Sequence, residues 1–166
     1  MDKKKWTKLI REHFAFLFEA YEFKIVSSVY EEEIFKDRIT ILESNKNIVE
    51  LDLERGVRLV IYISPKHDPS IKRRLRHIEG YLKGKPPAWP LYDEVGDEQR
   101  IEQLALASNL FKEHADTIFS LYSLENAAET EKKFDAYFND MIPYLVTSTM
   151  QPFDEAQIKK PKDKNS

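Results

Sequence analysis

Histidines and acidic side chains are the residues of this 166-residue chain best suited to acid–base or metal chemistry. The motif SPKHDPS places His67 in a loop after a strand-like run, and His77 follows in the next segment. Together with Asp93, these residues could form a hydrolytic site only if the fold brought them into one pocket. The two prolines of the motif favour an ordinary turn around His67.

The motifs of common enzyme classes are missing from the sequence. It contains no HExxH, GxSxG, GxxxxGK[ST] or GxGxxG pattern, only four glycines and no cysteine. A glycine-rich phosphate cradle is therefore hard to build, and the common zinc arrangements are missing. The acidic residues between Asp93 and Glu102 lack calcium-loop spacing and suit the start of a helix. We predict no catalytic residue, no metal site and no cofactor, which favours a noncatalytic protein.

The segment IKRRLRHIEGYLKGK, residues 71–85, predicts a basic helix. Its apolar residues recur at helical spacing: Ile71, Leu75, Ile78 and Leu82. Arg73, Arg74 and Arg76 are candidate partner contacts, because forked guanidinium donors bind carboxylates and phosphates. The simpler interpretation is a helix docked on the sheet with a solvated basic face.

The loop GKPPAWPLYDEVG, residues 84–96, adds two aromatic candidates. Trp89 and Tyr92 stand between prolines, where such side chains can anchor an interface with few rotatable bonds. An equally good interpretation is that both fold back onto the edge of the core. We include them with the three arginines as candidate partner-binding residues.

The stretch VELDLERGVRLVIYI, residues 49–63, alternates apolar odd positions with polar even ones, which predicts two half-buried antiparallel strands. A three-residue loop at 54–56 would pair Leu53 with Val57 and Leu51 with Leu59. Upstream, a loop at 45–47 would pair Leu51 with Ile41 and place that isoleucine in the core.

Further elements follow from the same patterns. Phe23 and Ile25 indicate an additional strand before this meander. Three stripes at helical spacing predict helices: Trp6, Leu9, Ile10, His13, Leu17 and Phe18; Ile101, Leu104, Ala105, Phe111, Ala115, Ile118, Phe119 and Tyr122; Phe134, Tyr137, Phe138, Met141 and Leu145. The predicted fold is α+β: an antiparallel meander of three or four strands, with an N-terminal helix and C-terminal helices packed on one face.

Composition bounds the domain count and the compartment. With 42% hydrophobic and 33% charged residues, the chain suits one folded domain, which we place at residues 1–150. Residues 151–166 are polar and rich in lysine, so we expect a flexible tail. No apolar run approaches the roughly 20 residues of a membrane span, and the absence of cysteine fits the cytoplasm. A net charge of −3 gives no general attraction to nucleic acid.

The order of three segments resembles a group of small bacterial α+β proteins. These segments are FEAYEFKIVSSVYEEEIFKDRITILES, VELDLERGVRLVIYISP and LFKEHADTIFSLYSLENAAETEKKFDAYF, and the resemblance spans about residues 5 to 145. Some of these similar proteins are labelled as immunity proteins of bacterial toxin systems. The resemblance implies neutralisation of a toxin by binding, with no catalytic residue. The basic segment from Lys72 to Lys85 departs from the acidic surfaces that inhibitors of basic nuclease toxins present.

The preferred hypothesis is therefore noncatalytic binding of another protein, of the immunity type that the resemblance implies. An alternative is binding of nucleic acid or a phosphate-bearing ligand through residues 71–85, which would weaken steeply with salt. A third is a hydrolase with a site assembled from distant residues.

Overall fold

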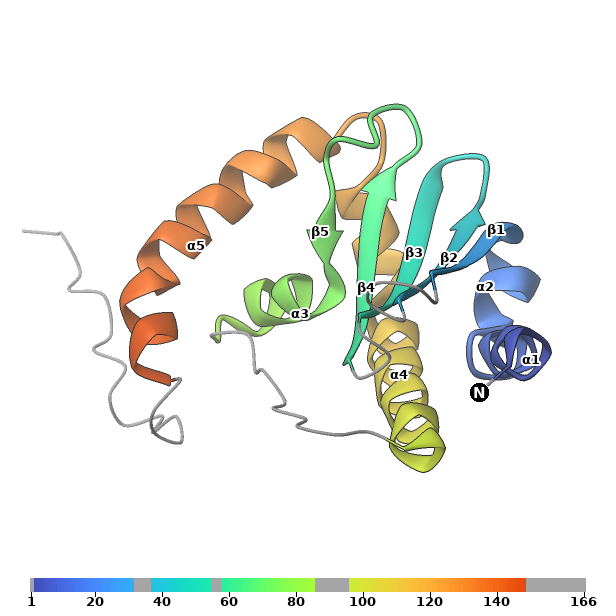
Figure 1. The fold of residues 1–166 in the computed structure, drawn as a ribbon. Coiled ribbons are helices and arrows are strands. Elements are labelled where there is room, and N and C mark those ends of the chain that lie inside the picture. The colour runs from blue at the N-terminus through green and yellow to red at the C-terminus, as the bar shows by residue number, and fades with distance from the viewer. Residues whose placement is uncertain (1, 32–36, 55–57, 86–95, 149–166) are drawn as a thin grey trace, which may run out of the picture.

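The computed structural model describes residues 2–31, 37–54, 58–85 and 96–148, which form one antiparallel sheet with helices around it (Figure 1). The elements in chain order are α1 (Lys3–His13), α2 (Ala15–Ala20), β1 (Lys24–Glu31), β2 (Asp37–Glu43), β3 (Asn47–Glu54), β4 (Arg58–Pro65), β5 (Arg73–Arg74), α3 (Leu75–Lys83), α4 (Asp97–Leu121) and α5 (Ala127–Ser148). The predicted α+β class and antiparallel meander are confirmed. The sheet has five strands in the order β1-β2-β3-β4-β5 rather than three or four.

The core lies between one face of the sheet and the helices. In Figure 1, α4 runs behind the sheet, α1 and α2 lie at its β1 end, and α3 and α5 lie at its β5 end. The predicted helical stripes supply the buried side chains, among them Trp6 and Ile10 of α1 and Phe111 and Ile118 of α4. We call the sheet face that meets α4 the core face and the opposite one the outer face.

The pairing of β3 with β4 differs from the predicted register by two residues. Leu53 pairs with Leu59, and Leu51 pairs with Ile61, instead of the predicted Leu53–Val57 and Leu51–Leu59 pairs. Because side chains alternate with a period of two, this shift leaves the odd positions on the core face. The predicted burial of Leu51, Leu53 and Ile61 is therefore confirmed although the register was wrong.

The predicted facing of β2 is wrong. Thr40, rather than Ile41, pairs with Leu51, and Ile41 pairs with Glu50. A one-residue shift turns every side chain to the opposite face. Consequently Thr40 is fully buried on the core face, whereas Ile41 lies half-buried on the outer face.

The turn between β2 and β3 contributes to this shift. Asn47 does not complete a three-residue loop but begins β3, and the backbone N–H of Ser44 donates to its carbonyl at 2.9 Å. The Asn47 side chain is buried and its Nδ2 donates to the carbonyl of Tyr122, at the C-terminal end of α4, at 3.1 Å. Asn47 thus satisfies a carbonyl that the helix leaves unpaired, which holds it in the strand.

Contacts with α1 fix the buried polar residues of β2. The indole Nε1 of Trp6 donates to Thr40 Oγ1 at 3.1 Å, and Ser28 Oγ of β1 lies 3.2 Å from the same oxygen. Arg38 is also buried, and its Nη1 donates to the carbonyl of Asp2 at 3.1 Å. Since a buried indole N–H needs an acceptor, an isoleucine in place of Thr40 would leave Trp6 unsatisfied.

The basic segment is helical only in part. The predicted helix over residues 71–85 is wrong at its N-terminal end, because Arg73 and Arg74 form β5 and pair with Ile63 and Tyr62. Backbone pairing with β4 replaces the first helical turn, and α3 begins at Leu75. The apolar stripe still meets the core, since Leu75 and Ile78 are buried.

The described part of the chain contains no helix long and apolar enough to cross a membrane. Residues 151–166, for which we expect a flexible tail, lie outside the described residues. The assignment of residues 1–150 to a single domain stays a prediction.

We expect Thr40→Val to lower the free energy of unfolding by about 1–3 kcal/mol, because the valine fills the same volume but leaves the Trp6 N–H without an acceptor. Urea unfolding followed by tryptophan fluorescence measures the change. Thr40→Ser, which keeps the hydroxyl, is the matched control and should be the more stable variant. A Thr40→Val protein as stable as wild type would contradict the role of this hydrogen bond.

Candidate functional site

Arg73 ties β5 to α5. Its Nε donates to Oε2 of Glu131 at 2.9 Å, and its Nη2 donates to Oδ1 of Asp135 at 2.6 Å. The guanidinium carbon also lies 5.8 Å from the ring centre of Phe134 and 5.7 Å from that of Phe138. Both its charge and its planar surface are therefore engaged within the protein.

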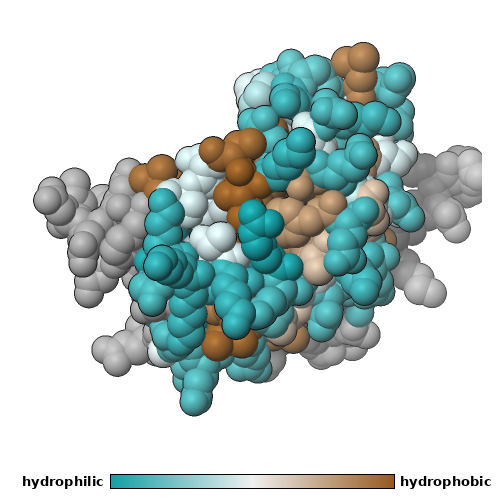
Figure 2. Space-filling model, turned by 90° about the vertical axis from the view of Figure 1, so that its right-hand side faces the viewer, coloured by the Kyte–Doolittle hydropathy of each residue, from teal (hydrophilic) through white to brown (hydrophobic). Residues whose placement is uncertain are grey.

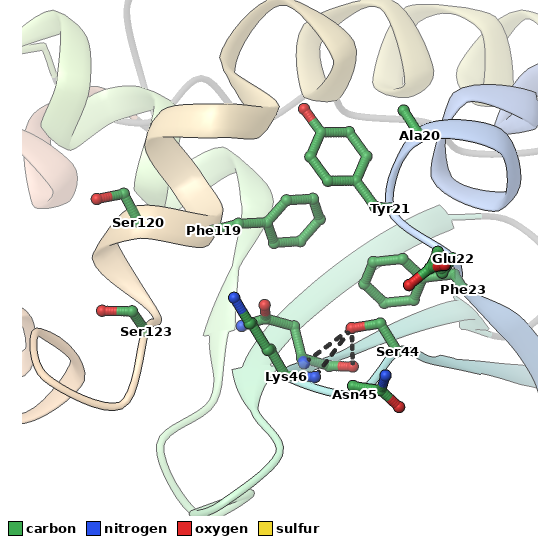
Figure 3. Close-up of a pocket in the computed structure, with 11 residues that line it drawn as sticks. Ala20, Tyr21, Glu22, Phe23, Ser44, Asn45, Lys46, Phe119, Ser120 and Ser123 are labelled. Carbon is green, nitrogen blue, oxygen red and sulfur yellow. Dashed lines mark hydrogen bonds between the residues drawn. The ribbon is translucent and has the colours of Figure 1, made fainter.

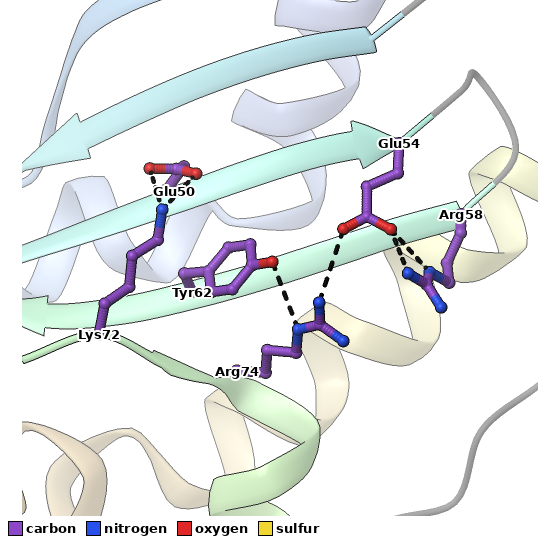
Figure 4. A network of polar contacts seen from close by, with 6 residues as sticks. All are labelled: Glu50, Glu54, Arg58, Tyr62, Lys72 and Arg74. Atoms are coloured by element: carbon purple, nitrogen blue, oxygen red, sulfur yellow. Dashed lines mark hydrogen bonds and ion pairs between the residues drawn. The ribbon is translucent and has the colours of Figure 1, made fainter. Parts of the chain in front are cut away.

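Arg74 belongs to a ladder of opposite charges on the outer face (Figure 4). Its Nε donates to the hydroxyl of Tyr62 at 3.3 Å, and its Nη2 lies 3.8 Å from Glu54. Glu54 also pairs with Arg58 along the same face. These pairs neutralise positive charge that the sequence analysis assigned to a partner surface.

The remaining cations of the basic segment also face carboxylates. Lys72 Nζ lies 2.8 Å from Glu50 of β3, so the ladder continues along β3 from Glu54 to Glu50 (Figure 4). Arg76 lies 3.9 Å from Glu79, one turn along α3. Arg73, Arg74 and Arg76 thus have three different sets of partners, on α5, on β3 and on α3. Trp89 and Tyr92 lie outside the described residues.

The histidines of the hydrolase hypothesis have different surroundings. His77 packs against Phe138 with the ring centres 4.8 Å apart, and burial together with the charges of Arg74 and Arg73 lowers its pKa to about 4. His67 is exposed after β4, and Asp93 lies outside the described residues. Within the described ranges, no group of His, Asp and Glu side chains is arranged to hold a metal ion.

The free edge of β1 presents apolar side chains. β1 pairs with β2 on one side, and no described strand pairs with its other side, which we call the β1 edge. Val26 and Val29 are 53% and 50% exposed there, and Figure 2, which views this side of the molecule, shows brown hydrophobic patches in a largely teal surface. A register shift between Ile25 and Ser27 leaves Val26 in a β-bulge. The bulge interrupts the alternation of sides, so both valines reach the surface.

A pocket of about 470 Å³ lies beside the start of β1 (Figure 3). It is bounded by the α2–β1 turn, the β2–β3 turn and the C-terminal end of α4. The rings of Tyr21, Phe23 and Phe119 line it, and the polar residues Lys46 and Ser120 stand at its rim. Sequence reasoning missed this pocket, because its walls come from three segments distant in the chain.

Comparison of the chain with protein-family models, with curated proteins and with solved structures gives no match. The interpretation of the β1 edge and the pocket therefore depends on their geometry and chemistry.

Replacing Arg73 should destabilise the protein. We expect Arg73→Met to lower the free energy of unfolding by about 1–3 kcal/mol, because Glu131 keeps its charge in a partly buried position without its partner. Arg76→Met is the matched control and should change stability by less than about 0.5 kcal/mol, since its ion pair is long and only partly buried. Urea unfolding compares the two variants, and equal effects would contradict the structural role of Arg73.

Acid should destabilise the protein through His77. Its pKa is about 4 in the fold and 6.5 without it, so the unfolded chain binds the proton more readily and stability falls as the pH drops from 6.5 towards 4. His77→Phe should lose part of this dependence in urea unfolding measured between about pH 7 and pH 5. His67→Gln, at an exposed histidine, should keep the wild-type slope. A wild-type slope in His77→Phe would contradict the prediction.

Proposed function

We propose that this protein is a noncatalytic protein-binding domain, and that its partner adds a strand to the β1 edge. The observation that carries the proposal is an edge strand, β1, which has no described neighbour on one side and carries two exposed valines. Backbone N–H and C=O groups on a free edge are matched best by another extended chain. Val26 and Val29 add apolar area beside those groups, and removing such area from water strengthens binding.

The neighbouring strand extends this apolar surface. Val29 pairs with Ile39, and Ser27 pairs with Ile41, so both isoleucines lie on the outer face beside β1. They are half-buried by the protein itself. A strand added at β1 would place its own outer side chains next to Val29, with Ile39 one strand further on the same face. This arrangement supports recognition of an extended segment with apolar residues at alternate positions.

The basic segment is a weaker candidate for the contact surface. Binding of phosphates or of an acidic partner by Lys72, Arg73 or Arg74 would have to compete with the carboxylates that these cations already meet. Neutralisation of a bacterial toxin is the particular form of protein binding that we propose from the resemblance alone. The absence of cysteine supports the cytoplasm as the compartment in which it acts.

Peptides selected from a random display library test the proposal. We expect bound peptides to be rich in β-branched and aromatic residues and to lose about tenfold or more in affinity for a Val26→Lys/Val29→Lys protein, because lysine disfavours pairing at a strand edge. Fluorescence anisotropy with labelled peptides measures the loss.

Leu106→Lys and Leu124→Lys are matched controls, because these leucines are 50% and 70% exposed and lie away from β1. Both control proteins should bind the peptides as wild type does. Peptides that bind the β1 variant normally, a library that yields no binder, or pairing of two copies through β1 in sedimentation would each contradict the proposal. Binding that shifts to nucleic acid and falls steeply with salt would favour the alternative.

A further inference from the structure

We infer that the pocket of Tyr21, Phe23 and Phe119 is the specificity site of the same surface, and that it accepts a tryptophan or tyrosine side chain of the bound strand. The inference rests on the proposed function, because it assigns a chemical class to the partner of the β1 edge. Its test is separate, since strand addition at β1 does not itself require an occupied pocket.

The walls of the pocket suit a planar aromatic group. The ring centres of Tyr21 and Phe119 are 4.7 Å apart, and those of Phe23 and Phe119 are 5.5 Å apart. In Figure 3 the ring of Phe119 points from α4 towards the other two rings. Aromatic side chains prefer tilted or edge-on neighbours at these separations, so an inserted ring can extend an existing cluster.

One wall is held in place before any ligand arrives. The hydroxyl of Tyr21 donates to Oδ1 of Asp116 on α4 at 2.6 Å. Burial and the neighbouring carboxylate raise the pKa of Tyr21 to about 12, which favours the protonated phenol that donates this bond. A fixed wall lowers the entropy that binding must overcome.

The rim of the pocket is polar. Glu22, Lys46 and Ser120 surround the aromatic walls and stand open to solvent. A side chain with an apolar body and a polar edge satisfies both parts, because its ring is buried while its N–H or O–H meets the rim. Tryptophan and tyrosine have this character, whereas phenylalanine and aliphatic side chains lack the polar edge.

Glu22 supplies an independent observation at the rim. Its φ of 57° is the only positive value at a non-glycine residue in the described ranges. Left-handed backbone disfavours a residue with a Cβ, and glycine is usual at this position after a helix. A carboxylate at this rim position can accept a hydrogen bond from the N–H or O–H of the inserted ring.

The pocket lies next to the start of β1 in the chain. Phe23 lines the pocket, and β1 begins at the next residue, Lys24. A strand added antiparallel to β1 runs towards Lys24, so its C-terminal end lies at the end of β1 that adjoins the pocket, and residues after that end would have to turn around the α2–β1 turn to enter it. The regular part of the edge begins at Ser27, beyond the bulge. At about 3.3 Å per residue, the aromatic anchor should lie roughly four residues after the segment that pairs there.

A double-variant comparison across the interface tests the inference. For a selected peptide, replacing the aromatic anchor by alanine should weaken binding to wild type by about tenfold or more. The same replacement should have little effect on binding to a Ser120→Trp protein, whose pocket is filled by its own indole. Thr117→Trp, at an exposed position of α4 that does not line the pocket, is the matched control and should respond as wild type does.

N-acetyl-tryptophan amide provides a second readout that needs no strand pairing. In NMR titrations it should shift the amide signals of residues 20–23, 44–47 and 119–123 in wild type and leave them unchanged in Ser120→Trp. Peptides that bind at β1 with no dependence on the anchor or on Ser120 would overturn the inference and leave the proposed function standing. Peptides that bind the Val26→Lys/Val29→Lys protein as tightly as wild type would overturn the proposed function.

Discussion

The fold depends on how the core face of the sheet accommodates the indole of Trp6. A buried N–H requires an acceptor, and Thr40 supplies it from the middle of β2. That contact turns β2 so that its isoleucines leave the core face and lie on the outer face. The apolar surface beside β1, on which partner binding would depend, is therefore a consequence of a polar requirement inside the core.

Charge has a mainly internal role in this protein. The run of basic residues joins β5 to α5 and forms the charge ladder with β3, so it connects the β5 end of the sheet to its neighbours. Such pairs contribute little each when exposed, but they fix which elements lie together. At the opposite end of the sheet, the described residues present the edge of β1, two exposed valines and the neighbouring pocket.

The spacing of apolar residues predicted strands and helices correctly where burial of one face alone determines the structure. The alternation in β3 and the stripe of Phe111, Ala115 and Ile118 in α4 were sufficient to identify their buried faces. It failed at β2, because Ile39 and Ile41 are more apolar than Thr40, and a contact with α1 together with the β2–β3 turn gives them the opposite facing. It failed again at Arg73, because pairing with β4 outweighs helical spacing.

The candidate site could not be predicted from the sequence, because it also depends on contacts between distant segments. Exposure of Val26 depends on a bulge, and the sequence of β1 gives no sign of where the extra residue falls. The pocket joins the end of α2, a turn and the end of α4, and only the finished fold brings Tyr21 to Phe119. A positive φ at Glu22 is likewise a property of the helix end rather than of the residue type.

Amide hydrogen exchange along β1, with and without a selected peptide, tests the central claim most directly. The account predicts that the peptide slows exchange across residues 24–31, because its backbone accepts hydrogen bonds from the free edge. Exchange across α3 should not change. Protection confined to residues 72–83, with β1 unaffected, would contradict strand addition and place the partner on the basic segment.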